Sequence, residues 1–369
     1  MGDKGGSVNG KSKWRWLPAA LIVLALATIA AGCGGGGSSA TTGGGAGAST
    51  GGGKQFKIGL VSDTGGVDDR GFNQFTIAGL KRAEKELGVT TRVYVSNSAD
   101  DYLPNLQAAV QDGNDLVIAV GFLLGPSVVT AAKASPNTSF AGVDNFFGGD
   151  PCESTPSCET KSQPNVLGMI YPTEQAGYLA GIVAAMITKT KVVSTVGGKK
   201  IPPVDNWIAG YMQAVKDTDP SIKELNAYSN DFEDQAKCKE IALDQIANKS
   251  DVVFQVAGKC GLGALDAACE KNVNAIGVDA DQSFAGPCVV TSALKPLESS
   301  VFALIKQFVD GQFKGGTNAS YGIKDLPDAE LLAPYTDAVP QAVQDAVEAA
   351  KQKIISGEIT PPATIDAVK

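Results

Sequence analysis

The sequence of 369 residues predicts an α/β protein with two doubly wound, parallel-sheet lobes joined by a hinge. Short apolar runs alternate with stretches of helical spacing from residue 56 to about residue 356. The length fits two domains of about 150 residues each. The order of the segments indicates a chain that builds one lobe, crosses to the second and then crosses back. Such a chain forms a cleft that closes around a ligand by hinge rotation.

Residues 1–32 are typical of a lipoprotein signal peptide. Basic side chains precede an apolar run over residues 17–31. The run ends in small residues and then Cys33, which resembles a bacterial lipobox with the cysteine as the lipidated mature N-terminus. An ordinary membrane anchor is the alternative, but a spanning helix needs roughly 20 apolar residues. We therefore expect a lipoprotein that is exported and anchored to the outer face of the cell membrane.

Residues 33–54 carry the lipidated cysteine and then a flexible linker of Gly, Ser, Thr and Ala. About twenty such residues reach roughly 25 Å on average. This tether places a globular body near the membrane surface, where it captures or senses something outside the cell.

The charge balance, 31 basic against 39 acidic side chains, disfavours a nucleic-acid partner or an anionic membrane bound by charge. The chain has no histidine, so the commonest general base and metal ligand are missing. We expect neither an enzyme nor a bound metal or cofactor.

Apolar runs, often β-branched, predict the buried strands. They are Ile58–Val61, Arg92–Val95, Leu116–Val120, Phe140–Val143, Val192–Val196, Val252–Val256, Ala275–Val278 and Val289–Ala293. Helical spacing covers about 72–87, 102–112, 126–134, 173–188, 205–217, 235–248, 262–272, 297–309 and 340–356. Gly168–Pro172 is interpreted as a crossover between lobes, and residues 319–335 as an extended stretch.

These elements divide between an N-terminal and a C-terminal lobe. Residues 56–171 and about 296–322 form the first, and residues 172–295 and about 323–360 form the second.

Six cysteines follow Cys33, and an even number in an exported protein suggests disulfides. Cys152 and Cys158 are expected to form a disulfide within their own loop. The strand geometry places one pair at the carboxyl edge of the second sheet and another at its opposite edge, which predicts Cys238–Cys260 and Cys269–Cys288. A cysteine-rich metal site is the alternative, but the paired C-x-x-C spacing of zinc sites is lacking.

The loop from Asp63 to Phe72 is the first candidate for a binding site. An apolar strand ends in Asp63, a charged loop with glycines follows, and a helix opens at about Phe72. In open α/β sheets, ligands bind outside the carboxyl ends of the strands. Asp68, Asp69 and Arg70 are interpreted as the rim of this site.

Several motifs in order resemble the basic membrane protein family of bacterial substrate-binding lipoproteins, which includes purine-nucleoside receptors. They are Asp69-Arg70-Gly71-Phe72-Asn73-Gln74, Val120-Gly121-Phe122, Phe140 to Asp144, Pro203 to Gly210, Val256-Ala257-Gly258, Ile276 to Gln282 and Thr291 to Lys295. The resemblance covers about residues 56–358. It implies a type I periplasmic-binding-protein fold, an ABC permease as partner and a nucleoside, in particular a purine nucleoside, as ligand.

The resemblance also implies the ligand-binding residues. They are Asp63, Phe72, Asn73, Asp144, Trp207, Gly258, Asp279, Asp281 and Lys295. Two features depart from the family pattern: Gly71 stands where the family has Ser, and residues 148–164 look inserted near the cleft. Both departures concern the identity of the ligand more than the fold.

These residue types suit a nucleoside. Aromatic rings stack on a flat base, so Phe72 and Trp207 are expected to sandwich it from the two lobes. Asp279 and Lys295 can hold the ribose hydroxyls, and Asn73 and Asp144 can bond to a base edge.

Three other functions stay open at this point. The same fold can bind a sugar or another polar small molecule, or it can act as a surface sensor without a transporter. The cleft carboxylates also leave a nucleoside hydrolase as a remote option.

Overall fold

The computed structural model describes Gly2 and residues 55–147, 163–326 and 330–369. Several predicted features lie outside the described residues: the signal peptide, Cys33, the linker and the Cys152–Cys158 disulfide. Within the described part of the chain, no helix has the length and apolar character needed to cross a membrane.

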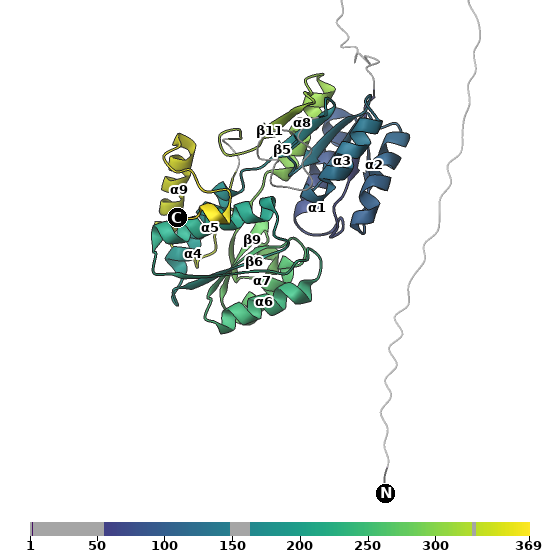
Figure 1. Ribbon diagram of the computed structural model, residues 1–369. Coiled ribbons are helices and arrows are strands. Elements are labelled where there is room, and N and C mark those ends of the chain that lie inside the picture. The colour runs from purple at the N-terminus through teal and green to yellow at the C-terminus, as the bar shows by residue number, and fades with distance from the viewer. Residues whose placement is uncertain (1, 3–54, 148–162, 327–329) are drawn as a thin grey trace, which may run out of the picture. The chain divides into compact units, whose positions relative to one another are not determined.

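The N-terminal lobe is built on a parallel sheet (Figure 1). Across the sheet, its strands are β11 (Thr317–Ser320), β5 (Val166–Ile170), β4 (Ser139–Val143), β3 (Leu116–Val120), β1 (Lys57–Val61) and β2 (Thr90–Tyr94). Ile58 of β1 lies opposite Thr91 of β2 on one side and Leu116 of β3 on the other. Every residue of β3 is buried, because helices cover both faces of a parallel sheet.

Two layers of helices enclose this sheet. One layer holds α1 (Phe72–Leu87) and α8 (Leu297–Val309), which share a core with the sheet through Leu80, Val301 and Leu304. The other layer holds α2 (Tyr102–Gln111) and α3 (Gly125–Ala134). The helix α8 is therefore contributed by a segment far along the chain, and this requires the chain to return from the second lobe.

The C-terminal lobe repeats this plan. Its parallel strands, in order, are β10 (Val289–Leu294), β9 (Asn274–Asp279), β8 (Val252–Val256), β6 (Val192–Gly197) and β7 (Lys223–Tyr228). In chain order these correspond to β5, β4, β3, β1 and β2 of the first lobe. Residues 331–336 then run antiparallel beside β10, where the Leu294 amide donates to the Leu331 carbonyl (2.9 Å) and the Ala333 amide to the Ser292 carbonyl (2.8 Å).

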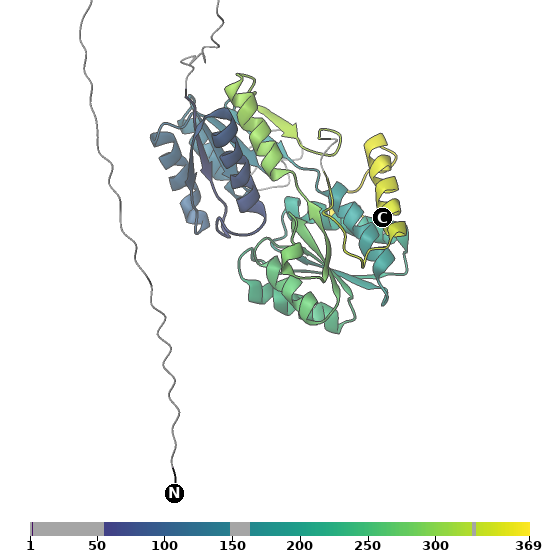
Figure 2. The same cartoon turned by 180° about the vertical axis from the view of Figure 1, so that it is seen from behind.

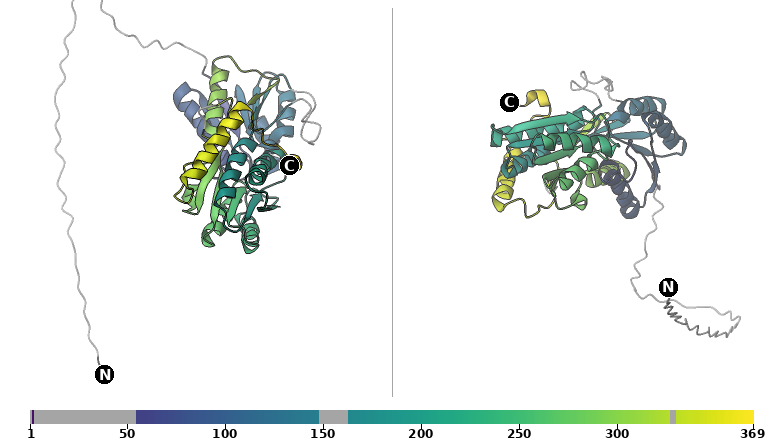
Figure 3. Two further views of the ribbon diagram at one scale, coloured as in Figure 1. Left: turned by 90° about the vertical axis from the view of Figure 1, so that its left-hand side faces the viewer. Right: turned by 90° about the horizontal axis from the view of Figure 1, so that it is seen from below.

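The helices α4 (Glu174–Ile187), α5 (Pro202–Thr218) and α9 (Gln341–Ser356) cover one face of the second sheet. The yellow helix α9 lies beside α4 in this lobe (Figures 2 and 3). The helices α6 (Gln235–Ala247) and α7 (Gly261–Glu270) cover the other face. Short 3-10 turns complete the described structure at Ala99–Asp101, Phe122–Leu124, Ser283–Ala285 and Ile365–Ala367.

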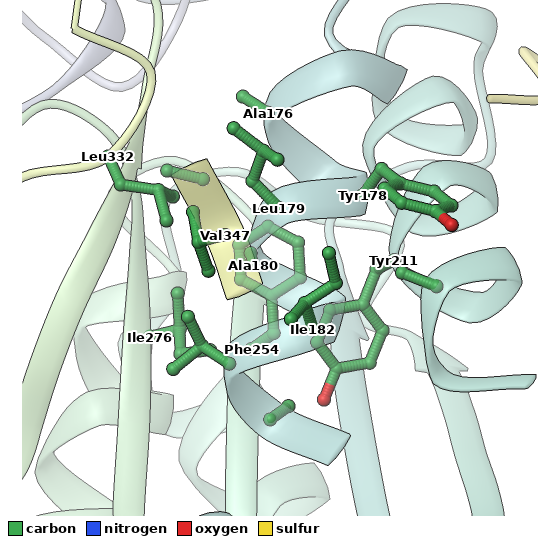
Figure 4. Packing of buried hydrophobic residues seen from close by; sticks show 14 of the residues in the cluster. Ala176, Tyr178, Leu179, Ala180, Ile182, Tyr211, Phe254, Ile276, Leu332 and Val347 are labelled. Atoms are coloured by element: carbon green, nitrogen blue, oxygen red, sulfur yellow. The ribbon is translucent and has the colours of Figure 1, made fainter. Parts of the chain in front are cut away.

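Close packing between α4 and α5 fixes the position of α5 on this sheet. A Cβ atom at Gly177 of α4 would overlap the backbone of Trp207 on α5, so only glycine permits this approach. Beneath the two helices, the rings of Tyr211 and Phe254 stack with centroids 5.2 Å apart (Figure 4). The helix that carries Trp207 is therefore held on a rigid core.

The chain passes between the lobes at residues 171–173, at residues 295–296 and after Ser320. Two of these crossings touch, because the rings of Tyr171 and Tyr321 stack with centroids 5.5 Å apart. The Tyr171 hydroxyl also shares a hydrogen bond of 2.7 Å with the Ser300 hydroxyl at the start of α8. These crossings form the hinge.

The predicted fold of two parallel-sheet α/β lobes is confirmed. The interpretation of Gly168–Pro172 as a crossover is wrong in its first part, because Val166–Ile170 forms β5 and the crossing begins at Tyr171. The strand β7 was not predicted, since its sequence KELNAY is mostly polar, as suits an edge strand. The extended stretch at 319–335 splits between β11 and the segment beside β10.

Two disulfides lie in the second lobe with the pairing expected from the strand geometry. Cys238 is bonded to Cys260, with Cα atoms 5.6 Å apart, and Cys269 to Cys288, with Cα atoms 5.2 Å apart.

Candidate functional site

A pocket lies where the carboxyl ends of strands from both sheets face one another. From the first lobe it is lined by Asp63, Thr64, Gly65, Asp69, Phe72, Asn73, Gly121, Phe122 and Asp144. From the second lobe and the hinge it is lined by Ile201, Pro203, Val204, Trp207, Phe232, Val256, Gly258, Lys259, Val278, Asp279 and Lys295. This is the position at which α/β sheets bind ligands.

Asp63 follows β1 and is buried. Its Oδ1 atom accepts hydrogen bonds from the Tyr102 hydroxyl and from the Thr64 amide (2.7 Å). Burial raises the pKa of Asp63 to about 6, although these bonds act in the opposite direction. Gly121, at a φ of +108°, passes so close to this carboxylate that a Cβ atom there would overlap it.

Asn73 and Asp69 hold the loop between β1 and α1. Asn73 Oδ1 accepts from the Asp63 amide (3.0 Å), and its Nδ2 donates to the Thr64 carbonyl (3.1 Å). The Asp69 carboxylate accepts from the amides of Gly71, Asn73 and Gln74 at 3.1, 2.7 and 3.0 Å. Asp69 therefore satisfies free amides at the start of α1, as an N-terminal capping residue does. It is buried, and its expected place on the exposed rim is wrong.

Asp144 and Lys295 form an ion pair in the pocket. Lys295 Nζ lies 2.5 Å from both carboxylate oxygens of Asp144. The two side chains are only 2% (Lys295) and 8% (Asp144) exposed, so water screens this pair weakly. The same ammonium lies 4.8 Å from the centroid of Phe72 and 4.7 Å from that of Tyr171. Lys295 therefore connects the first lobe, the hinge and the pocket.

Asp279, at the end of β9, has no hydrogen bond to its carboxylate within the described part of the chain and lies on the pocket wall. Burial raises its pKa to about 7, the Lys295 ammonium lowers it, and the carboxylates of Asp144 and Asp69 raise it further. Asp144 and Asp279 both adopt left-handed backbone conformations, with φ of 60° and 66°. Asp279 is thus a carboxyl group that a ligand with hydroxyl or amine donors can bond.

Among the residues that the structure describes, four aromatic side chains line the pocket. Phe72 and Phe122 come from the first lobe, and Trp207 and Phe232 from the second. Trp207 is 2% exposed and makes an edge contact with Phe254, with centroids 6.4 Å apart. It therefore forms part of a fixed wall of the pocket.

Most of the predicted binding residues come together in this pocket. Asp63, Phe72, Asn73, Asp144, Trp207, Gly258, Asp279 and Lys295 all line it. Asp281 does not: its side chain is exposed and accepts from the Ser283 amide (2.9 Å).

The pocket is also lined by Phe122, Phe232 and Lys259, which were not predicted from the sequence. Phe122 stands in a motif noted above, directly after a strand and a glycine, and this position was a usable signal. Phe232 lies in the loop after strand β7. Because β7 was not predicted, Phe232 could not be recognised as a residue at the carboxyl end of a strand.

Comparison with known proteins identifies the family of this chain. Residues 56–364 match the family model for PnrA-like ABC transporter substrate-binding proteins. The chain is 32% identical to the ABC transporter nucleoside-binding protein BmpA of Lactococcus lactis subsp. cremoris, covering 95% of this chain and 99% of the relative. It is 30% identical to an uncharacterized lipoprotein of Pyrococcus horikoshii, covering 96% of this chain and 84% of that protein.

A solved structure agrees with the fold. The chain superimposes on a solute-binding protein of an ABC transporter system from Aeropyrum pernix with a TM-score of 0.73 and 25% identity, over 84% of this chain and 95% of the other. Proteins of this kind bind solutes and catalyse no reaction, so the expectation of a protein without enzymatic activity is confirmed. The chain belongs to the PnrA-like family of ABC transporter substrate-binding proteins.

Proposed function

We propose that this chain is a lipid-anchored receptor that captures a nucleoside in the cleft and presents it to an ABC permease. The observation that carries the proposal is the pairing of aromatic surfaces from both lobes with a carboxyl group, Asp279, that has no bonded partner within the described residues. A nucleoside joins a flat aromatic base to a ribose with hydroxyl donors, and it needs both kinds of surface.

The base is assigned to the space between Phe72 and Trp207. An aromatic pair contributes about 0.5–1.5 kcal/mol beyond the area it buries. Trp207 is held by the core, whereas Phe72 stands at the start of α1 in the other lobe. A base between them therefore contacts both lobes at once, and its binding favours the closed cleft.

The ribose is assigned to Asp279 and Lys295. The ionised Asp279 carboxylate can accept bonds from ribose hydroxyls, and bonds to a charged group contribute about 1.5–3 kcal/mol each. Lys295 is already paired with Asp144, so it supplies a fixed positive charge beside the sugar.

Two relatives support the finer parts of the proposal. The Lactococcus protein is named as nucleoside-binding, and the Pyrococcus protein as a lipoprotein. The basic, apolar and Cys33 pattern of residues 1–33 agrees with the second name.

A binding panel tests the ligand. The protein is unfolded in guanidinium without reductant, freed of bound ligand and refolded with its disulfides intact. Calorimetry then compares purine and pyrimidine nucleosides with free bases, ribose and hexoses. We expect binding of intact nucleosides and much weaker binding of either half alone. Binding of a hexose with no response to any nucleoside would contradict the assignment.

The anchor is tested separately. In a bacterial host that lipidates exported proteins, the wild type should incorporate labelled fatty acid and Cys33→Ala should not. Equal labelling of the two proteins would contradict lipidation at Cys33.

A further inference from the structure

The disulfide between Cys238 and Cys260 joins two loops that line the pocket. One loop, residues 229–234, connects β7 to α6 and carries Phe232. The other, residues 257–260, connects β8 to α7 and carries Gly258 and Lys259. Cys238 lies in the first turn of α6 and Cys260 directly follows Lys259, so the bond closes the wall behind these lining residues.

The contacts around this bond reinforce the arrangement. The Cys260 amide donates to the Phe232 carbonyl at 2.9 Å. A third loop is attached as well, because the Asn230 amide donates to the Gly198 carbonyl at 2.9 Å and Lys199 Nζ lies 5.7 Å from the centroid of Phe232. Both sulfur-bearing residues are fully buried. The disulfide is thus surrounded by hydrogen bonds that link the loops of the second lobe lining the pocket.

The second disulfide, Cys269–Cys288, lies away from the pocket. Cys269 lies near the end of α7 and Cys288 directly precedes β10, at the opposite edge of the sheet from the pocket. Neither residue lines the pocket. The sequence separations are similar, 22 residues for Cys238–Cys260 and 19 for Cys269–Cys288. In the chain-entropy model, two such cross-links restrict the unfolded chain almost equally.

We propose that the Cys238–Cys260 disulfide is a positioning element of the ligand site, which holds the loops of Phe232, Gly258 and Lys259 in their binding arrangement. This inference rests on the proposed function, since it concerns the same cleft. Without the bond, the two loops sample more conformations in the free protein. Ligand binding must then order them, which lowers the affinity.

The test compares C238A/C260A with C269A/C288A and the wild type, each as the full chain. Calorimetry with guanosine as the probe measures the Kd, and hydrogen exchange of the ligand-free proteins follows residues 229–234 and 257–260. We expect both variants to lose similar thermal stability. Only C238A/C260A should bind about tenfold more weakly and exchange faster in the two loops.

The inference is overturned if the Kd of C238A/C260A rises less than about fivefold, or if it rises equally in both variants. If the wild type binds no nucleoside, the proposed function fails, while the exchange data still show whether the bond orders the loops. If C238A/C260A does not fold, the C269A/C288A variant is titrated with dithiothreitol. Alkylation and mass spectrometry then locate the free thiols as the Kd is measured. A Kd that stays constant while Cys238 and Cys260 become alkylated also overturns the inference.

Discussion

The affinity for a nucleoside should rise with pH and depend on Asp279. Its pKa is raised from an ordinary 3.8 to about 7, because burial and the neighbouring carboxylates of Asp144 and Asp69 outweigh the opposing effect of the Lys295 ammonium. The ionised form is the better acceptor for ribose hydroxyls, so the ligand lowers this pKa on binding. The bound complex then holds fewer protons than the free protein between about pH 4 and pH 7.

The size of the effect follows from the pKa of about 7. If binding restores an ordinary carboxyl pKa, the Kd should increase about 30-fold between pH 8 and pH 5.5. Binding at pH 6.5 should release about three-quarters of a proton, and at pH 8 about a tenth. Calorimetry in buffers of different ionisation enthalpy measures this number directly.

The control is Asp279→Asn, which should remove the proton release and most of the pH dependence. A slope that remains reports the other pocket carboxyl groups whose pKa is raised by burial, Asp63 (to about 6) and Asp69. A wild-type Kd that is constant from pH 5.5 to 8, or an Asn variant with the wild-type pH profile, would refute the assignment of Asp279 to the ribose. The raised pKa of Asp279 also affects folding. Because the unfolded chain releases this proton at a lower pH than the folded protein, the ligand-free protein should lose stability as pH rises from about 4 to about 7, and Asp279→Asn should lose less.

Three further predictions concern single side chains. Lys295→Met leaves Asp144 charged and unpaired in a buried place, so the free energy of unfolding in urea should fall by about 3–5 kcal/mol. Lys259→Met, on the same pocket but without a described ion pair, is its control and should cost less than about 1 kcal/mol. Gly177→Ala forces a methyl group against the α5 backbone and should lower the same free energy by about 1–3 kcal/mol, whereas an unchanged urea midpoint would show that α4 and α5 can separate freely. Phe72→Leu keeps an apolar side chain but removes the stacking surface, so calorimetry should show a Kd about 2- to 13-fold higher with a nearly unchanged melting temperature.

Much of the fold follows from short-range patterns. The apolar runs of β1, β3, β4, β6, β8, β9 and β10 were recognisable because strands inside a parallel sheet are buried on both faces. The edge strand β7 has no such run, and it was missed together with Phe232 behind it. Val166–Ile170 was apolar enough to be a strand, but its glycine and the nearby Pro172 resembled a connection.

Pocket-lining residues were predictable where they stand at the end of a strand. They were less predictable where a local hydrogen bond determines the direction of the side chain. Asp144 and Asp279 both end strands and both face the pocket. Asp281 stands two residues further, and the hydrogen bond that it accepts from the Ser283 amide cannot be read from residue types. Asn73 reaches the pocket as expected, yet two of its side-chain atoms are engaged within its own loop. A sequence shows which side chains are near a site, but not which of their hydrogen bonds are already made.

The repeated plan of the two lobes gives the cleft two equivalent carboxyl groups. Asp144 follows β4 and Asp279 ends β9, which hold the same place in their sheets, and both residues have the same backbone handedness. Lys295, directly after β10, breaks this equivalence: the corresponding residue after β5 is Tyr171, and the lysine forms its ion pair with Asp144. Lys295 thus gives these two carboxyl groups different surroundings: Asp144 is paired with an ammonium group, whereas the Asp279 carboxylate has no hydrogen bond within the described residues. A ligand with two unlike halves can therefore enter such a cleft in only one favourable orientation.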